Sequence, residues 1–370
     1  MGGASDDLLG RLERLERLVE EHGKRLDDLL HRGAGSRPGR RGDVTPPLNP
    51  ARVQNRRPGS RSPEAPRTVA PTFAPSPRVL RAPGVYVCGG HASGVTLGAA
   101  ARYNSATSVW EALPPMPTPR HGCSAASMVG VVYVLGGANE SALPLDTVER
   151  FDPTRGSWEV LPSMPTPRHG AASAAVAGLL YCAGGYDGGV LSVMERFDPA
   201  AHSWEQLPDM PCARGRCAAA ACEGLLFVVG GTDDSSRELD AAECFDPSTW
   251  KWEVLPSLPS PRCGCAAAAL SGAVFVLGGR RGGEKLTTVE RFDLRLRRWD
   301  SVLALSGPRD ACAAAVLSNQ LYVFGGRGVG VAGNQTLASA ECFDPATGLW
   351  TSLPAMPHAT CGCAAAAAER

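Results

Sequence analysis

The sequence predicts an all-β fold, a six-bladed β-propeller of four-stranded antiparallel blades over residues 82–370. Three observations support this. A marker glycine pair recurs six times, at intervals of 47, 48, 46, 48 and 47 residues. Each repeat holds short runs that suit strands, and the C-terminal residues complete the first repeat. Repeats of this length that recur without interruption are typical of propeller blades arranged around an axis.

Each repeat is marked by a glycine pair after an apolar run. The pairs are Gly89-Gly90, Gly136-Gly137, Gly184-Gly185, Gly230-Gly231, Gly278-Gly279 and Gly325-Gly326. An aromatic residue follows, with a tryptophan seven positions later: Tyr103/Trp110, Phe151/Trp158, Phe197/Trp204, Phe245/Trp252, Phe292/Trp299 and Phe343/Trp350. Glycine allows a sharp turn into a loop. We expect the aromatic residue to open the third strand and the tryptophan to lie on the outer strand, between neighbouring sheets.

Runs of small residues, such as CSAAS, AASAA and CAAAA, precede the apolar runs. Helix propensity alone would make the alanine runs helical. However, two short runs that are separated by a turn and end in a glycine pair fit two adjacent strands. Small side chains also suit strands that converge on a central axis, so these runs predict the innermost strand of each blade.

Five repeats carry an arginine and a glutamate at fixed positions, and the first repeat lacks both. The arginines lie sixteen residues before the glycine pair: Arg120, Arg168, Arg214, Arg262 and Arg309. The glutamates lie two residues before the aromatic residue: Glu149, Glu195, Glu243, Glu290 and Glu341. The first repeat has Thr360 and Ala101 at these positions. This joint absence predicts structural, partly buried pairs of arginine and glutamate within each of the other five blades.

The two ends of the repeat region complement each other. Gly89 follows Arg78 by only eleven positions, too few for the small-residue strand. The C-terminal sequence TCGCAAAAAER matches RCGCAAAA at residues 262–269 and reaches no glycine pair. We therefore expect the tail to supply the innermost strand of the first blade, which leaves no sheet edge open.

These motifs resemble those of kelch-repeat proteins over residues 82–370. The resemblance implies four-stranded blades around a channel. It also implies that the residues after each glycine pair, and those that start each innermost strand, border one mouth of the channel. The predicted partner-binding residues there are His91, His121, Asn139, His169, Tyr186, Asp187, Thr232, Asp233, Arg280, Arg281, Asp310 and Arg327, with Ala138, Gly215, Asp234, Cys263 and Cys361 beside them.

This mixture of arginine, histidine, tyrosine and acidic residues is typical of an interaction surface. We therefore expect a scaffold or adaptor that binds a protein partner, with no catalytic residue and no cofactor. Arg280, Arg281 and Arg327 suggest an acidic partner. The alternatives are attachment to actin or the cytoskeleton, substrate recognition for a ubiquitin ligase, and a kelch-type enzyme. Kelch-like copper oxidases need tyrosine and histidine ligands, whereas most of the six tyrosines here fall in core strand positions.

Two segments precede the repeats. Residues 6–31 place Leu8, Leu12, Leu15, Val19, His22, Leu26 and Leu29 in a heptad seam, which predicts a short coiled coil for self-association or an amphipathic helix that docks elsewhere. Residues 32–81 hold ten prolines and eleven arginines, so a disordered linker is expected. Contact with nucleic acid is expected, if at all, only from this linker.

Composition sets the remaining expectations. The net charge is zero, and the thirteen cysteines are an odd number. Without an expected secretory signal, a disulfide framework is not expected, so the cysteines are interpreted as buried free thiols, and no metal site is predicted. No window is apolar enough to span a membrane. These features predict a cytoplasmic protein, with a nuclear location as the alternative.

Overall fold

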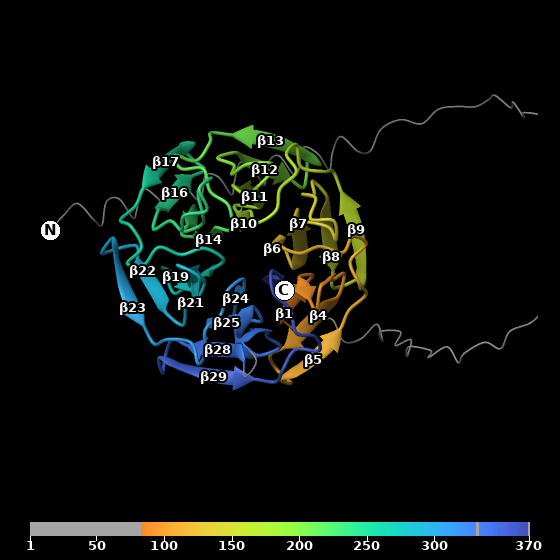
Figure 1. Ribbon diagram of the computed structural model, residues 1–370. Coiled ribbons are helices and arrows are strands. Elements are labelled where there is room, and N and C mark those ends of the chain that lie inside the picture. The colour runs from red at the N-terminus through yellow and green to blue at the C-terminus, as the bar shows by residue number, and fades with distance from the viewer. Residues whose placement is uncertain (1–82, 331–332, 369–370) are drawn as a thin grey trace, which may run out of the picture. The chain divides into compact units, whose positions relative to one another are not determined.

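A computed structural model describes residues 83–330 and 333–368. In these residues six four-stranded antiparallel sheets form a ring, and no helix is present (Figure 1). The all-β six-bladed propeller is therefore confirmed. The coiled coil predicted for residues 6–31 and the linker predicted for residues 32–81 lie outside the described residues.

Each blade runs from an innermost strand at the axis to an outermost strand at the rim. In this order, blade 1 contains β30 (Ala364–Ala368), β1 (Gly84–Cys88), β4 (Ala100–Asn104) and β5 (Val109–Ala112). Blade 2 contains β6 (Ser124–Met128), β7 (Val131–Leu135), β8 (Val148–Asp152) and β9 (Ser157–Leu161). Blade 3 contains β10 (Ala172–Val176), β11 (Leu179–Ala183), β12 (Met194–Asp198) and β13 (Ser203–Leu207).

The other three blades repeat this order. Blade 4 contains β14 (Ala218–Cys222), β15 (Leu225–Val229), β16 (Ala242–Asp246) and β17 (Lys251–Val254). Blade 5 contains β18 (Ala266–Leu270), β19 (Ala273–Leu277), β22 (Val289–Asp293) and β23 (Arg298–Val302). Blade 6 contains β24 (Ala313–Leu317), β25 (Gln320–Phe324), β28 (Ala340–Asp344) and β29 (Leu349–Leu353).

Strand β30 closes the ring. It pairs antiparallel with β1, in a register that places Ala368 opposite Gly84 and Ala364 opposite Cys88. The C-terminal strand thus completes the first blade, as the sequence predicts. The backbone groups on this side of β1 are paired within the sheet and are not left as an open edge.

The innermost strands carry the small side chains. Along β14, alternate alanines are buried against the neighbouring blade, whereas Ala219 and Ala221 are only half-buried. Residues of all six innermost strands line a central cavity of about 220 Å³, and most of them are alanines. The alanine runs are strands because they converge on the axis, where larger side chains would collide.

Aromatic packing joins the outer parts of the blades. The aromatic residue of each repeat is the fourth residue of the five-residue third strand, not its first as expected; Phe151 in β8 is an example. Its ring lies 5.2 Å from that of Trp158 on β9. The repeat tryptophan of every blade donates through Nε1 to a backbone oxygen of the preceding blade: Trp110 to Pro354, Trp158 to Pro114, Trp204 to Pro162, Trp252 to Pro208, Trp299 to Pro256 and Trp350 to Leu303.

The glycine pairs connect each blade to the next. In blade 3, Gly184 has φ +67°, and a Cβ atom there would lie 2.5 Å from the backbone oxygen of Arg214. The backbone N–H of Gly185 donates to that same oxygen at 3.0 Å. Only glycine therefore combines this backbone conformation with so close an approach.

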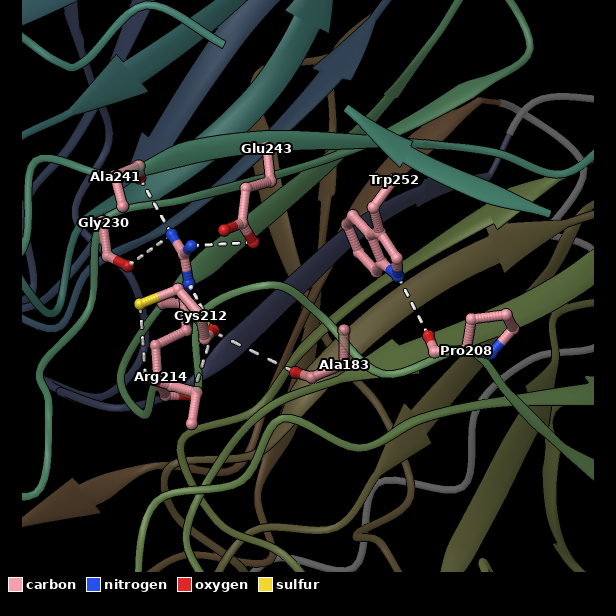
Figure 2. A network of polar contacts seen from close by, with 10 residues as sticks. Ala183, Pro208, Cys212, Arg214, Gly230, Ala241, Glu243 and Trp252 are labelled. Atoms are coloured by element: carbon pink, nitrogen blue, oxygen red, sulfur yellow. Dashed lines mark hydrogen bonds and ion pairs between the residues drawn. The ribbon is translucent and has the colours of Figure 1, made fainter. Parts of the chain in front are cut away.

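Buried arginines continue this connection inside each blade (Figure 2). Nη1 of Arg214 donates to the backbone oxygens of Gly230 and Ala241, and Nη2 lies 2.8 Å from Oε2 of Glu243. Burial raises the pKa of Glu243, and the guanidinium of Arg214 opposes that shift. Because its own backbone oxygen accepts from blade 3, Arg214 bridges two blades.

The other four predicted pairs have the same arrangement. The ion pairs are Arg120–Glu149 at 2.9 Å, Arg168–Glu195 at 2.8 Å, Arg309–Glu341 at 2.6 Å, and Arg262–Glu290. In blade 1 the Thr360 hydroxyl donates to the backbone oxygen of Gly89 at 3.0 Å. This smaller contact occupies the place of the arginine.

Candidate partner-binding face

The candidate site is the face of the propeller that carries the glycine-pair loops, which we call the loop face. The two sets of residues predicted to border the channel mouth lie side by side there, joined by backbone bridges within each blade. The bridges are His91–Cys361, His121–Ala138, His169–Tyr186, Gly215–Thr232, Cys263–Arg280 and Asp310–Arg327. Three two-stranded ribbons rise from this face: β2 (His91–Ala92) with β3 (Val95–Thr96), β20 (Arg280–Arg281) with β21 (Glu284–Lys285), and β26 (Arg327–Gly330) with β27 (Gly333–Thr336).

A closed circle of backbone hydrogen bonds surrounds the axis beneath these residues. Its members, one per blade, lie two residues before each innermost strand: Gly122, Gly170, Arg216, Gly264, Ala311 and Gly362. Each N–H donates to the carbonyl oxygen of the member in the preceding blade, at 2.7–2.9 Å. All six have positive φ, between +51° and +63°. We call this circle the axial ring.

Arg216 is a binding candidate that the sequence analysis missed. It has φ +51° in the axial ring, at a position where four other blades have glycine. Residues other than glycine are disfavoured there, and such strained residues often occur at functional sites. The side chain of Arg216 is exposed. The signal in the sequence is Arg-Gly-Arg at residues 214–216, in place of the Arg-x-Gly of blades 2, 3 and 5.

Three arginines from neighbouring blades favour the charged form of one buried carboxylate, that of Asp310. Asp310 is 7% exposed, and burial raises its pKa, against the opposing effect of Arg280, Arg327 and Arg216. Nε of Arg280 donates to Sγ of Cys263 at 3.3 Å, and Nε of Arg327 donates to Sγ of Cys361 at 3.4 Å. We call Arg216, Arg280 and Arg327 the arginine cluster.

Arg281 lies next to this cluster in sequence but has a different environment. It is exposed in β20 and faces Glu284 across the ribbon. The sequence grouped Arg280, Arg281 and Arg327, whereas in the structure Arg216 completes the set that acts on Asp310.

Histidine and aromatic side chains occupy blades 1 to 3 of the loop face. The rings of His91 and His121 lie 5.6 Å apart, and Nδ1 of His121 is 3.0 Å from the Thr96 hydroxyl. His169 stacks on Tyr186 at 5.2 Å. Burial lowers the pKa of both His121 and His169; neighbouring positive groups contribute, chiefly His91 for His121 and Arg216 for His169.

Some predicted partner-binding residues have their polar atoms engaged within the propeller. Thr232 is 2% exposed, and its hydroxyl is hydrogen-bonded to that of Tyr186. Oδ1 of Asn139 accepts from the N–H groups of Ser141 and Leu143. Asp233 accepts likewise from Ser235 and Arg237 within its own loop. Thr232, Asn139 and Asp233 therefore hold the loops in place, whereas Asp187 is exposed.

The cysteines behave as small buried side chains. All thirteen are free thiols, and twelve are buried. Burial raises the pKa of Cys217, for example, to about 11. Within residues 83–330 and 333–368, no three or more histidine, cysteine or acidic side chains cluster in a way that could hold a metal ion. The same residues include no helix long and apolar enough to cross a membrane.

Comparison with known proteins agrees with this architecture. A family model described as the KLHDC2/KLHL20/DRC7 Kelch-repeats domain matches residues 170–369, and one described as the Kelch motif matches residues 119–165. A solved structure titled "Structure of YjhT" is similar, with a TM-score of 0.60 and 18% identity, and the match covers 69% of this chain and 89% of that chain. At this identity the likeness shows the fold alone. Comparison with curated proteins finds no significant match.

Proposed function

We propose that this chain, which belongs to the kelch-repeat family, is a scaffold that uses its loop face to bind a protein partner through an acidic segment. The arginine cluster carries this proposal. Arg216 and Arg327 are exposed and Arg280 is half-buried, and they come from three consecutive blades. Guanidinium groups present several donors in a planar fork that matches carboxylates.

The chemistry of the loop face favours binding over catalysis. Asp310 is buried, and the positively charged groups around it that reach solvent are the guanidinium groups of the arginine cluster and the ammonium group of Lys285. These donate hydrogen bonds but do not exchange protons at neutral pH. Residues 82–370 contain 21 basic and 27 acidic residues, so attraction of an acidic partner must be local to the arginine cluster. Binding should therefore weaken with salt.

The arginine cluster can be tested with a fluorescein-labelled octaglutamate peptide. We expect the triple variant Arg216→Gly, Arg280→Gln, Arg327→Gln to bind it at least about tenfold more weakly than the wild type, because three favourable charges are lost. Fluorescence anisotropy on the full chain measures this. Thermal melting should show no loss from Arg216→Gly, since glycine fits the positive φ of the axial ring.

A matched control removes three exposed arginines elsewhere. Arg155, Arg295 and Arg297 lie in turns between third and fourth strands, at the other end of the blades. Their replacement by glutamine should change peptide affinity by no more than about twofold. Equal binding by the triple cluster variant and the wild type would contradict the proposed site. Co-purification from a lysate with the wild type and both triple variants would then identify the natural partner.

We further propose that residues 6–31 make the propeller multivalent. A coiled coil that joins several loop faces raises apparent affinity without new contacts. We expect analytical ultracentrifugation to give a mass of at least two chains for the full-length protein and of one chain for a protein that starts at Ala82. Identical monomer masses would rule this out.

The thirteen free thiols suit a reducing compartment, and we place the protein in the cytoplasm or nucleus.

A further inference from the structure

Asp310 is a carboxylate buried inside a group of cations without a direct partner. In the described part of the chain its side chain forms neither a hydrogen bond nor an ion pair. The positive charges of Arg280, Arg327, Arg216 and Lys285 nevertheless favour its charged form. This contrasts with the buried glutamates of the blades, whose carboxylates lie 2.6–2.9 Å from an arginine in four of the five pairs. Asp310 therefore neutralises the arginine cluster only at a distance.

The arginines are held so that they do not close on Asp310. Arg280 and Arg327 each donate through Nε to a cysteine sulfur, and no contact within the described residues occupies their Nη groups. The backbone of Arg216 is fixed by two hydrogen bonds of the axial ring. The Nη groups of Arg280 and Arg327 are thus available to an anion from solvent, whereas the Asp310 carboxylate is buried.

We propose that Asp310 is an internal competitor of the partner's acidic group, which weakens anion binding in its charged form and takes up a proton from solvent when an acidic ligand binds. This rests on the proposed function of the loop face. A ligand carboxylate brings a second negative charge to the same arginines. Because like charges in a partly desolvated site disfavour each other's ionisation, one proton is taken up as the ligand binds.

The sign of the linkage follows from this uptake. A ligand that binds together with a proton binds more tightly as the pH falls. Burial raises the pKa of Asp310, in the same direction as the expected effect of the ligand. Replacing Asp310 by asparagine keeps the shape of the side chain and removes the charge. The variant should therefore bind the acidic ligand more tightly near neutral pH and should no longer take up this proton.

Other titratable groups respond to pH in the same direction. His121 lies near His91, His169 and Arg327, and His169 lies near Arg216 and Asp187. Protonation of these histidines also makes the loop face more positive. A pH effect in the wild type alone therefore does not identify Asp310, and the variant must be compared with a control of equal charge change. Glu223→Gln, in the exposed turn between β14 and β15 and away from the loop face, provides it.

The experiment measures the affinity of full-length wild type, Asp310→Asn and Glu223→Gln for the octaglutamate peptide, at about pH 5.5 and about pH 7.5 and constant ionic strength. For Asp310→Asn at the higher pH we expect about three- to tenfold tighter binding than for the wild type. This is the size of one interaction between unit charges near a protein surface. Its affinity ratio between the two pH values should be smaller than that of the wild type. Glu223→Gln should stay within about twofold of the wild type at the higher pH and keep most of its pH ratio.

The outcomes separate the two proposals. If wild type binds and Asp310→Asn binds no more tightly than Glu223→Gln, or keeps the full pH ratio, the role of Asp310 is overturned while the arginine cluster stands. If the triple cluster variant binds as well as the wild type, the proposed function fails, whatever Asp310 does. If none of the proteins binds the peptide, both proposals are overturned.

Discussion

Replacing Glu195 by glutamine is expected to lower the free energy of unfolding by about 3 to 5 kcal/mol. The Glu195 carboxylate lies 2.8 Å from Nη2 of Arg168, and both side chains are almost completely buried. The substitution leaves the guanidinium charge without its counter-ion in the interior. Urea unfolding of the full chain measures the loss.

A double-mutant cycle separates the ion pair from the other contacts. Arg168→Met should be similarly costly because it also removes bonds to the backbone oxygens of Gly184 and Val193. The double variant should lose much less than the sum of the two single losses. Arg196 and Glu205 on the same blade, 2.7 Å apart and partly exposed, give the matched control, for which about 0 to 1 kcal/mol is expected. Additive losses at Arg168 and Glu195 would show that the pair is not coupled.

Gly184→Ala is expected to cost about 3 kcal/mol or more. The new Cβ would lie 2.5 Å from the backbone oxygen of Arg214, and that oxygen also accepts the N–H of Gly185. Relief of the clash must therefore disturb the contact between blades 3 and 4. Thermal and urea unfolding measure the effect.

The control for this substitution is Gly188→Ala. Gly188 also has positive φ, at +76°, but a Cβ there would meet no atom within 4 Å. Only the backbone conformation is penalised, so the expected cost is about 1 kcal/mol. Similar losses at both glycines would mean that the close approach of the blades contributes little.

The strands and the closure of the ring could be predicted because the repeats align. Six copies of each glycine pair and tryptophan fix the order of the strands, and the short first repeat requires β30. The partners Arg168 and Glu195 were identifiable because blade 1 lacks both residues together. Each of these inferences depends on position within the repeat, which the sequence contains directly.

The arrangement of the loop face was less predictable because it depends on backbone geometry specific to each loop. Asn139 and Asp233 look like exposed binding residues in sequence, but their oxygens cap N–H groups of their own turns. The axial ring is formed by backbone atoms, and its six members share a positive φ but not a residue type. Arg216 was missed for this reason, since an arginine replaces the glycine that would have revealed the pattern.

The pairing of β30 with β1 has a consequence for synthesis. Strand β1, whose Val85, Tyr86 and Val87 are buried in the finished protein, emerges from the ribosome long before Ala364–Ala368. At about ten residues per second this delay is roughly half a minute. During that time the nascent chain exposes an apolar strand with an unpaired edge. This strand can pair with other nascent chains until Ala364–Ala368 arrive, so chaperones have most reason to act on the first blade.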